Sequence, residues 1–375
     1  MEPPGGAPRR GSSAIVFAAL ALAGFLFSLT PVCGRIDDAV LDLQWRLLRK
    51  LEMRPTPDEM IIVGVDEASL AMLPEPPPIW HEALGRALAR VAAAGPRAMA
   101  LDLPLPERSF DGVRAGLDQA LFDGLAAAAR AGPFVAVLAI DPATRGARRI
   151  HTPFLAVLGE KRLGLGLAAT DADGVARRFS LLVPTEDGGF PTLTGRLCRE
   201  LGRKCDEGLI DYGLGEPVLA VPLKNVLTMT DRGLFERLFR GKVVLFGQTQ
   251  GFVDRVPVPW NPAAWETGGG DSPGVVVHAQ TLRTALAGAP SEASRPMILV
   301  LATLSAIFWL LRRWKLAAVT LLVVAIGAFT ASTLLLRAGH HVPLGAVLST
   351  LVLAWASRAL VEVRTRRLSN IQQPH

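Results

Sequence analysis

The sequence predicts an α/β domain with a mainly parallel sheet, joined to four transmembrane helices, one before the domain and three after it. Hydrophobic residues make up 50% of the 375-residue chain, and the mean hydropathy is +0.32. Such a mixture is typical of membrane spans attached to a folded aqueous domain. Continuous apolar runs of strand length alternate with amphipathic helical segments in the middle of the chain, which is the pattern of a parallel sheet.

The four predicted spans cover residues 13–32, 293–311, 316–336 and 342–360. A helix needs about 20 apolar residues to cross a hydrocarbon core of about 30 Å. The first and third stretches reach this length unaided, whereas the second and fourth need flanking residues. Two arginines before the first stretch also fit a secretory signal peptide, so cleavage of that segment stays open.

The positions of Lys and Arg near the span ends predict the orientation in a bacterial inner membrane. Ten of the 40 Lys and Arg lie outside residues 33–296, and one arrangement places nine of them in the cytoplasm. In it, residues 1–12 and the tail at 361–375 are cytoplasmic, and residues 33–292 form an extracytoplasmic domain. Only two of the 34 acidic residues lie outside residues 33–296, so that segment carries a net charge of −2. The net charge of +6 therefore belongs to the membrane flanks, which excludes a nucleic-acid partner.

The extracytoplasmic domain is expected to alternate strands and helices. Residues 60–66 are a continuous apolar run, as expected for a strand buried on both faces. Glycine–proline pairs at 95–96 and 132–133 end two amphipathic segments. Residues 163–183 are expected to form shorter strands around a turn. The predicted strands cover 60–66, 98–103, 134–140 and 241–247, and the predicted helices cover 80–94, 113–131, 190–201 and 274–286.

Polar residues follow three of these strands and are the candidate ligand-binding residues. Asp66 and Glu67 follow the first strand, Asp102 ends the second, and Asp254 follows the last. His278 lies in the final helix. The crevice outside the carboxyl ends of parallel strands is where ligands bind in open α/β sheets. The alternative is that Asp66 and Asp102 cap the following turns and helices, and that His278 only bonds to a loop.

The spacing of the cysteines and of the short motifs limits the chemistry that the sequence can support. Cys198 and Cys205 are predicted to form a disulfide if the domain faces an oxidising compartment, and the alternative is two unpaired structural cysteines. Asp171 and Asp173 match part of a calcium loop, but the other ligands are missing, so a glycine-assisted turn is favoured. No metal-ligand cluster or catalytic spacing occurs in the sequence. We therefore expect no metal, no cofactor and no enzymatic activity.

Five segments in order resemble the CHASE domain, type 2, the cyclases/histidine kinases associated sensory extracellular domain. The resemblance covers roughly residues 37–286. It implies an extracytoplasmic sensor of a small molecule or an envelope condition, of the kind joined to a cytoplasmic cyclase or kinase. The segments are 61–70 (IIVGVDEASL), 102–107 (DLPLPE), 171–177 (DADGVAR), 241–247 (GKVVLFG) and 273–279 (PGVVVHA).

The chain departs from this family in two places. Residues 76–80 are Pro-Pro-Pro-Ile-Trp, where the family usually has a Trp-Pro or similar turn. The tail after the last predicted span is too short for an output domain, which needs about 50 residues or more. We therefore expect a sensor with an unknown small-molecule ligand that signals through a separate protein. A non-catalytic accessory subunit of an envelope complex is the alternative, and a homodimer stays open.

Overall fold

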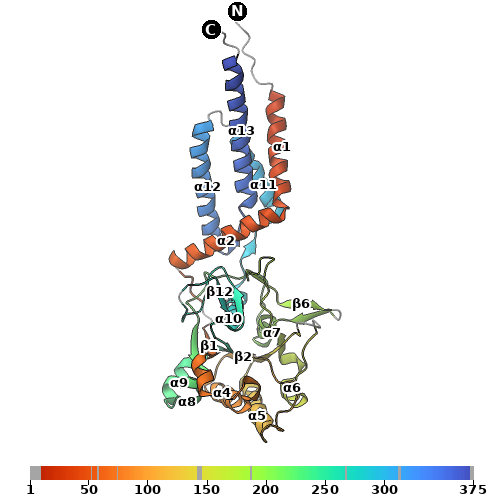
Figure 1. Ribbon diagram of the computed structural model, residues 1–375, viewed down its shortest axis with the longest axis vertical. Helices are drawn as coiled ribbons and strands as arrows, with labels where there is room; N and C mark the ends of the chain where they lie inside the picture. The colour runs from red at the N-terminus through yellow and green to blue at the C-terminus, as the bar shows by residue number, and fades with distance from the viewer. Residues whose placement is uncertain are drawn as a thin grey trace, which may run out of the picture. The chain divides into compact units, whose positions relative to one another are not determined.

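A computed structural model describes residues 10–51, 53–56, 59–73, 75–141, 146–185, 188–266, 268–310 and 314–371. The chain divides into two compact units (Figure 1). The sheet unit is Arg49–Ala289, and the helical unit combines Met1–Leu48 with Pro290–His375. Arg9, Arg312 and Arg313, which contributed to the predicted orientation, and the last four residues of the predicted tail lie outside the described residues.

The sheet unit contains a six-stranded sheet in which every pairing is parallel. The strand order is β4-β3-β2-β10-β1-β9. The prediction of a mainly parallel sheet is thus confirmed, and all four predicted strands are present. The strands are β1 (Met60–Val65), β2 (Ala98–Asp102), β3 (Phe134–Leu138), β4 (Leu163–Leu165), β9 (Leu219–Pro222) and β10 (Val243–Gln248).

Helices cover both faces of this sheet, as a parallel sheet requires. Figure 1 shows α4, α5, α8 and α9 on one side of β1 and β2, and α7 and α10 on the other. The four predicted helices correspond to α4, α5, α7 and α10. The helices are α3 (Glu67–Met72), α4 (His81–Ala93), α5 (Leu117–Ala131), α6 (Thr152–Leu158), α7 (Leu193–Glu200), α8 (Leu223–Thr228), α9 (Arg232–Phe239) and α10 (Gly274–Ala287).

Three pairs of short strands in the sheet unit, outside the main sheet, are antiparallel. Two of these pairs include strands from residues 163–183, where the sequence predicts short strands. The pairs are β5 (Arg178–Phe179) with β8 (Gly208–Leu209), β6 (Leu182–Thr185) with β7 (Gly188–Pro191), and β11 (Arg255–Pro257) with β12 (Asp271–Pro273). Cys198, on α7, is joined to Cys205, and their Cα atoms are 6.2 Å apart, within the usual range for a disulfide. Oxidation of this pair in the membrane-bound protein stays a prediction.

The helical unit contains α1 (Arg10–Ser28), α2 (Pro31–Leu51), α11 (Arg295–Ala306), the 3-10 turn η3 (Ile307–Leu310), α12 (Trp314–Arg337) and α13 (Gly345–Ile371). Among the described residues, α12 and α13 are long and apolar enough to cross a membrane. Helices α1 and α2 pass the same test only as a pair bent by 76°, which gives up to three spans in total.

The expectation of three C-terminal spans is wrong for residues 293–311. Helix α11 has only 12 residues, which is about 18 Å of α-helix against a hydrocarbon core of about 30 Å. The chain then continues in η3, and residue 311 lies outside the described residues. The apolar stretch was long enough by composition, but the change to 3-10 geometry at Ile307 ends the continuous helix.

Helices α4 and α5 pack through direct backbone contact. A Cβ atom added at Gly85 would lie 2.1 Å from the carbonyl oxygen of Ala120, and one added at Gly124 would lie 2.3 Å from the Cα of Gly85. Neither distance allows a side chain, so the two glycines set how closely the helices approach. This helix pair covers the sheet face whose core includes Leu88, Leu101 and Leu121.

Substitution of Gly85 by alanine is expected to lower the free energy of unfolding by about 1–3 kcal/mol, because overpacking forces the helices apart. Gly112→Ala is the matched control, since a Cβ there meets nothing within 4 Å and should change stability by less than about 0.5 kcal/mol. Denaturant unfolding of both variants checks this. Equal stability of the two variants would show that the close helix contact does not contribute.

Candidate ligand-binding site

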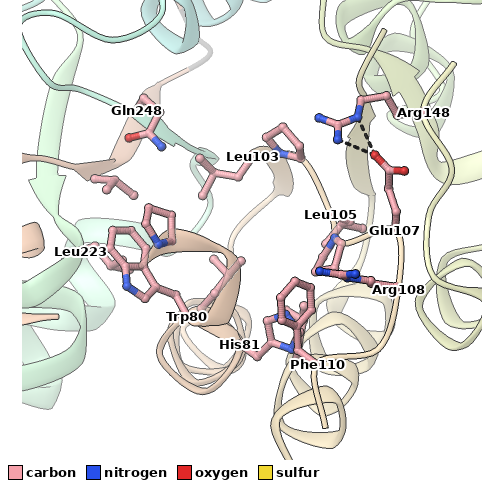
Figure 2. Close-up of a pocket in the computed structure, with 16 residues that line it drawn as sticks. Trp80, His81, Leu103, Leu105, Glu107, Arg108, Phe110, Arg148, Leu223 and Gln248 are labelled. Carbon is pink, nitrogen blue, oxygen red and sulfur yellow. Dashed lines mark hydrogen bonds and ion pairs between the residues drawn. The ribbon is translucent and has the colours of Figure 1, made fainter. Parts of the chain in front are cut away.

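A cavity of about 600 Å³ lies at the carboxyl ends of the central strands. Its walls include Val65, the last residue of β1, and Gln248, the last residue of β10. Leu103, directly after β2, also lines the cavity at this edge of the sheet and is labelled in Figure 2. Because ligands bind outside the carboxyl ends of strands in open α/β sheets, this cavity is the candidate site.

The rest of the lining is predominantly apolar, and all of it except Arg148, which lies in the loop after β3, comes from four segments. These segments are the 3-10 turn η1 (Pro77–Ile79) with the start of α4, the loop after β2, helix α5 and helix α8. A concave apolar site with a few polar groups is typical of small-molecule binding. The apolar lining residues are Pro77, Trp80, Leu84, Pro104, Leu105, Pro106, Phe110, Leu121 and Leu223.

The proline-rich segment before α4 fixes one wall of the cavity. Pro77 begins η1, where its fixed φ favours a helical turn and its missing N–H removes no bond. Trp80 follows at the N-cap of α4 and is 6% exposed. Its indole Nε1 donates a hydrogen bond of 2.6 Å to the carbonyl oxygen of Glu75. This bond fixes the indole, so the Pro-Pro-Pro-Ile-Trp segment supplies a rigid aromatic wall.

Four polar side chains contribute to the lining besides His81. The Oε1 of Gln248 is buried and has no hydrogen-bond partner among the described residues. Arg148 and Glu107 form an ion pair with 2.6 Å between Nε and Oε1. Arg108 is exposed, and its guanidinium carbon lies 5.7 Å from the ring centroid of Phe110. Figure 2 shows Gln248 and Arg108 on opposite sides of the cavity.

His81 is held by a carboxylate behind the cavity. Its Nδ1 lies 3.2 Å from Oδ1 of Asp118, and the Nε2 of His151 lies 3.7 Å from the other oxygen of that carboxylate. Burial alone would raise the pKa of Asp118, but hydrogen bonds from Ser109 and Phe110, together with the two imidazoles, lower it. Asp118 therefore stays ionised and orients the His81 ring in the cavity wall.

Two of the five predicted ligand-binding residues have structural partners beside the strand ends. Asp66 is the N-cap of α3, and its carboxylate accepts hydrogen bonds from the backbone N of Ser69 at 2.8 Å and from the Ser69 hydroxyl. Glu67 accepts a hydrogen bond of 3.1 Å from the backbone N of Gly251, in the loop after β10. Asp66 thus makes the capping contact that was the alternative to ligand binding.

The other three predicted residues form a cluster on the α10 side of the sheet. Oδ2 of Asp102 lies 4.0 Å from Nε2 of His278 and has no hydrogen-bond partner among the described residues. The backbone oxygen of Asp254 accepts a hydrogen bond of 2.8 Å from the backbone N of Gly274, which begins α10. A Cβ at Gly274 would lie 2.4 Å from the Asp254 carboxylate, so a side chain there would displace that carboxylate.

Burial controls the charge of this cluster. It raises the pKa of Asp102 well above the ordinary 3.8, and the nearby Asp254 carboxylate raises it further. Burial also raises the pKa of Asp254 and lowers the pKa of the His278 imidazole to about 4. The imidazole is therefore neutral at neutral pH, and its 4.0 Å contact with Asp102 is not an ion pair under these conditions.

None of the five predicted residues lines the 600 Å³ cavity. His278 instead lines a second, smaller cavity of about 230 Å³, together with Phe179, Thr192 and Thr281. The cavity residues are the immediate neighbours of the predicted ones: Val65 precedes Asp66, and Leu103 follows Asp102. Ligand binding by the five predicted residues stays a prediction.

The described residues contain no group of three or more His, Cys, Asp or Glu that could bind a metal ion. The part of the sequence that matched a calcium loop is arranged differently. Asp171 and Asp173 instead contact Arg177, with distances of 3.2 and 2.8 Å. Gly174 has a φ of +84° and donates a backbone hydrogen bond to Asp171, as expected for a glycine-assisted turn.

The substitution Asp102→Asn is expected to stabilise the protein at high pH and to leave it unchanged at low pH. The pKa of Asp102 is higher in the folded than in the unfolded chain, so the wild type loses stability as pH rises through the folded-state pKa. The asparagine variant does not titrate. His278 also makes the free energy of unfolding depend on pH, because its stabilising contribution falls as the pH drops from 6.5 to about 4. This effect is present in both proteins and therefore cancels when they are compared.

Unfolding midpoints measured from about pH 4 to about pH 8 check this difference. The exposed carboxylate of Asp206 provides the control variant, Asp206→Asn, for which no widening gap is expected. A constant difference between the wild type and Asp102→Asn over the whole range would contradict the buried, destabilised state of this carboxylate.

The family model of the CHASE2 domain matches residues 15–327, which include the whole sheet, the cavity and the Asp102 cluster. No family model of an output domain matches the chain. No curated protein and no solved structure matches it significantly. Because the match extends over most of the chain, from α1 into α12, the chain belongs to the CHASE2 domain family.

Proposed function

We propose that this chain is an extracytoplasmic sensor of a small molecule, anchored in the inner membrane, which binds its ligand in the cavity at the ends of β1, β2 and β10. The observation that carries the proposal is the 600 Å³ apolar cavity at this edge of the sheet. Its volume lies within the range of about 300–1,000 Å³ of small-molecule sites. Membership of a sensory domain family gives the cavity a function in detection.

The extracytoplasmic location rests on charge and on cysteine chemistry. The segment between the first and second apolar stretches carries a net charge of −2, whereas Arg9 and Arg10 precede the first stretch and favour a cytoplasmic N-terminus. A disulfide between Cys198 and Cys205 fits an oxidising compartment. The signal is passed to a separate protein, since the chain matches a sensory domain and no output domain.

Reporter fusions after Gly188 and after His375 test the location. We expect periplasmic reporter activity for the fusion after Gly188. Because α11 is too short to span and only α12 and α13 lie between the two fusion points, the fusion after His375 is expected on the same side, not in the cytoplasm as four spans would predict. Peptide mapping without reduction should recover Cys198 linked to Cys205, with the thiol of Cys33, which has no disulfide partner, as the internal alkylation control. Cytoplasmic activity of the fusion after Gly188, or two alkylated thiols at Cys198 and Cys205, would contradict the proposed compartment.

Ligand binding is tested by a thermal-shift screen of the full chain in nanodiscs against small organic molecules. A ligand at about 100 times its dissociation constant adds about 2.7 kcal/mol to the stability of the state that binds it. Leu103→Trp fills the cavity and should abolish the shift produced by any compound that binds there. Leu234→Trp is the control, because Leu234 lies on α9, is 40% exposed and is not part of the cavity lining.

A compound that shifts both tryptophan variants equally binds elsewhere and does not support the proposal. A screen in which no compound distinguishes Leu103→Trp from the wild type would favour the alternative, a non-catalytic accessory subunit of an envelope complex.

A further inference from the structure

We infer that the cavity binds a small monocarboxylic acid whose body is apolar and whose far end carries a hydrogen-bonding group such as a hydroxyl. This inference rests on the proposed function, because it names the ligand class of the same site. It is carried by three features of the lining: an uncompensated arginine, a buried amide oxygen without a partner, and apolar walls between them.

Arg108 supplies an uncompensated positive charge at the cavity. Its neighbour Glu107 is already engaged by Arg148, with 2.6 Å between Nε and Oε1. Among the described residues, no carboxylate lies within ion-pair distance of Arg108. Its guanidinium instead lies near the ring of Phe110. A guanidinium presents several donors in a plane that matches a carboxylate. An anionic group on the ligand is therefore the matching partner.

The opposite side of the cavity offers a neutral polar group. The Oε1 of Gln248 is buried without a hydrogen-bond partner in the described part of the chain. Leaving a buried amide oxygen unpaired is unfavourable, and a ligand hydroxyl or amide N–H that donates to it removes this cost. If the amide is rotated so that its nitrogen takes this position, it donates to a ligand oxygen instead, and a hydroxyl satisfies either arrangement.

The walls between these two groups limit the rest of the ligand. Trp80, Phe110, Leu105 and Leu223 present rings and methyl groups that offer no hydrogen bonds to a polyhydroxylated molecule. A sugar would lose its hydration on these walls without replacement, which is unfavourable. A nucleotide would bring several negative charges to one unpaired arginine. An amine would repel Arg108, because Glu107 is paired. The combination therefore selects an apolar body with a single negative charge.

The test uses four probes that differ at one group each: hydroxyphenylpropionate, its amide, the corresponding amine, and phenylpropionate. Binding is measured by calorimetry on the full chain in nanodiscs. We expect the acid to bind about tenfold more tightly than the amide, because the charge-assisted bond to Arg108 is lost in the amide. The amine should bind most weakly, and phenylpropionate should bind more weakly than the hydroxylated acid.

Two substitutions assign these preferences to residues. Arg108→Gln should weaken binding of the acid about tenfold and change the affinity for the amide by no more than about twofold. Arg237 is an exposed arginine of α9, and Arg237→Gln should change neither affinity. Gln248→Leu should remove the difference between hydroxyphenylpropionate and phenylpropionate. The split between acid and amide distinguishes a contact with the ligand from a general loss of folding, which would weaken both.

The ligand class is wrong if the amide or the amine binds as tightly as the acid, if Arg108→Gln weakens acid and amide equally, or if none of the four probes binds. The cavity itself is judged separately. Any probe or library compound whose binding is abolished by Leu103→Trp supports the site even when the preference for an acid fails. Binding that persists in Leu103→Trp would contradict the proposed function.

Discussion

The parallel pairing of β10 between β1 and β2 is the constraint on which the sheet unit depends. In this register Val65 lies opposite Gln248, and Asp102 lies opposite Gly247. Three strand ends from distant parts of the sequence therefore stop at the same level. Because all three strands are buried on both faces, helices must cover both sides of the sheet. Beyond the strand ends these helices no longer fill the space between them, and the cavity lies there.

The alternation of side chains along a strand then determines which residues meet on each face. Consecutive residues point to opposite faces of a sheet. Val63, Leu101 and Phe246 belong to the core under α4 and α5, so Val65, Leu103 and Gln248, two residues further along, continue on that face and line the cavity. Asp102 and Gly247 point the other way, toward α10, where Asp102 contacts His278 and a Cβ at Gly247 would meet Val275.

This alternation explains how much of the site could be predicted from the sequence. Uniform apolar runs identified β1, β2, β3 and β10, and the rule that ligands bind at strand ends led to the edge of the sheet where the cavity lies. The runs carry no alternation, however, so they do not say which residue faces which helix layer. The polar residues Asp66 and Asp102 were chosen for their chemistry, whereas the cavity is lined by their apolar neighbours. Strand β9 was missed, because its apolar run at 218–221 has only four residues and lies between Pro217 and Pro222.

The helical unit shows a different limit of the same reasoning. Apolar composition predicted α12 and α13 correctly, because a long apolar stretch has no alternative to a helix in a membrane. It did not reveal the change from α11 to η3 at Ile307, since no proline or glycine marks that position. The break is a matter of local backbone geometry and tertiary packing, which hydropathy does not report. The bend of 76° between α1 and α2 is better marked, by Pro31 at the start of α2.

The two faces of the strand ends differ in how closely side chains approach the backbone. On the α10 face, glycines at positions 64, 247 and 274 allow Thr249, Val275 and Asp254 to approach the backbone closely. Burial on this face raises the pKa of Asp102 and lowers that of His278, because each charged form loses its hydration. On the α4 face, the rigid turn at Pro77 and the proline-containing loop after β2 prevent such an approach. The space that close packing cannot fill is the space available to a ligand.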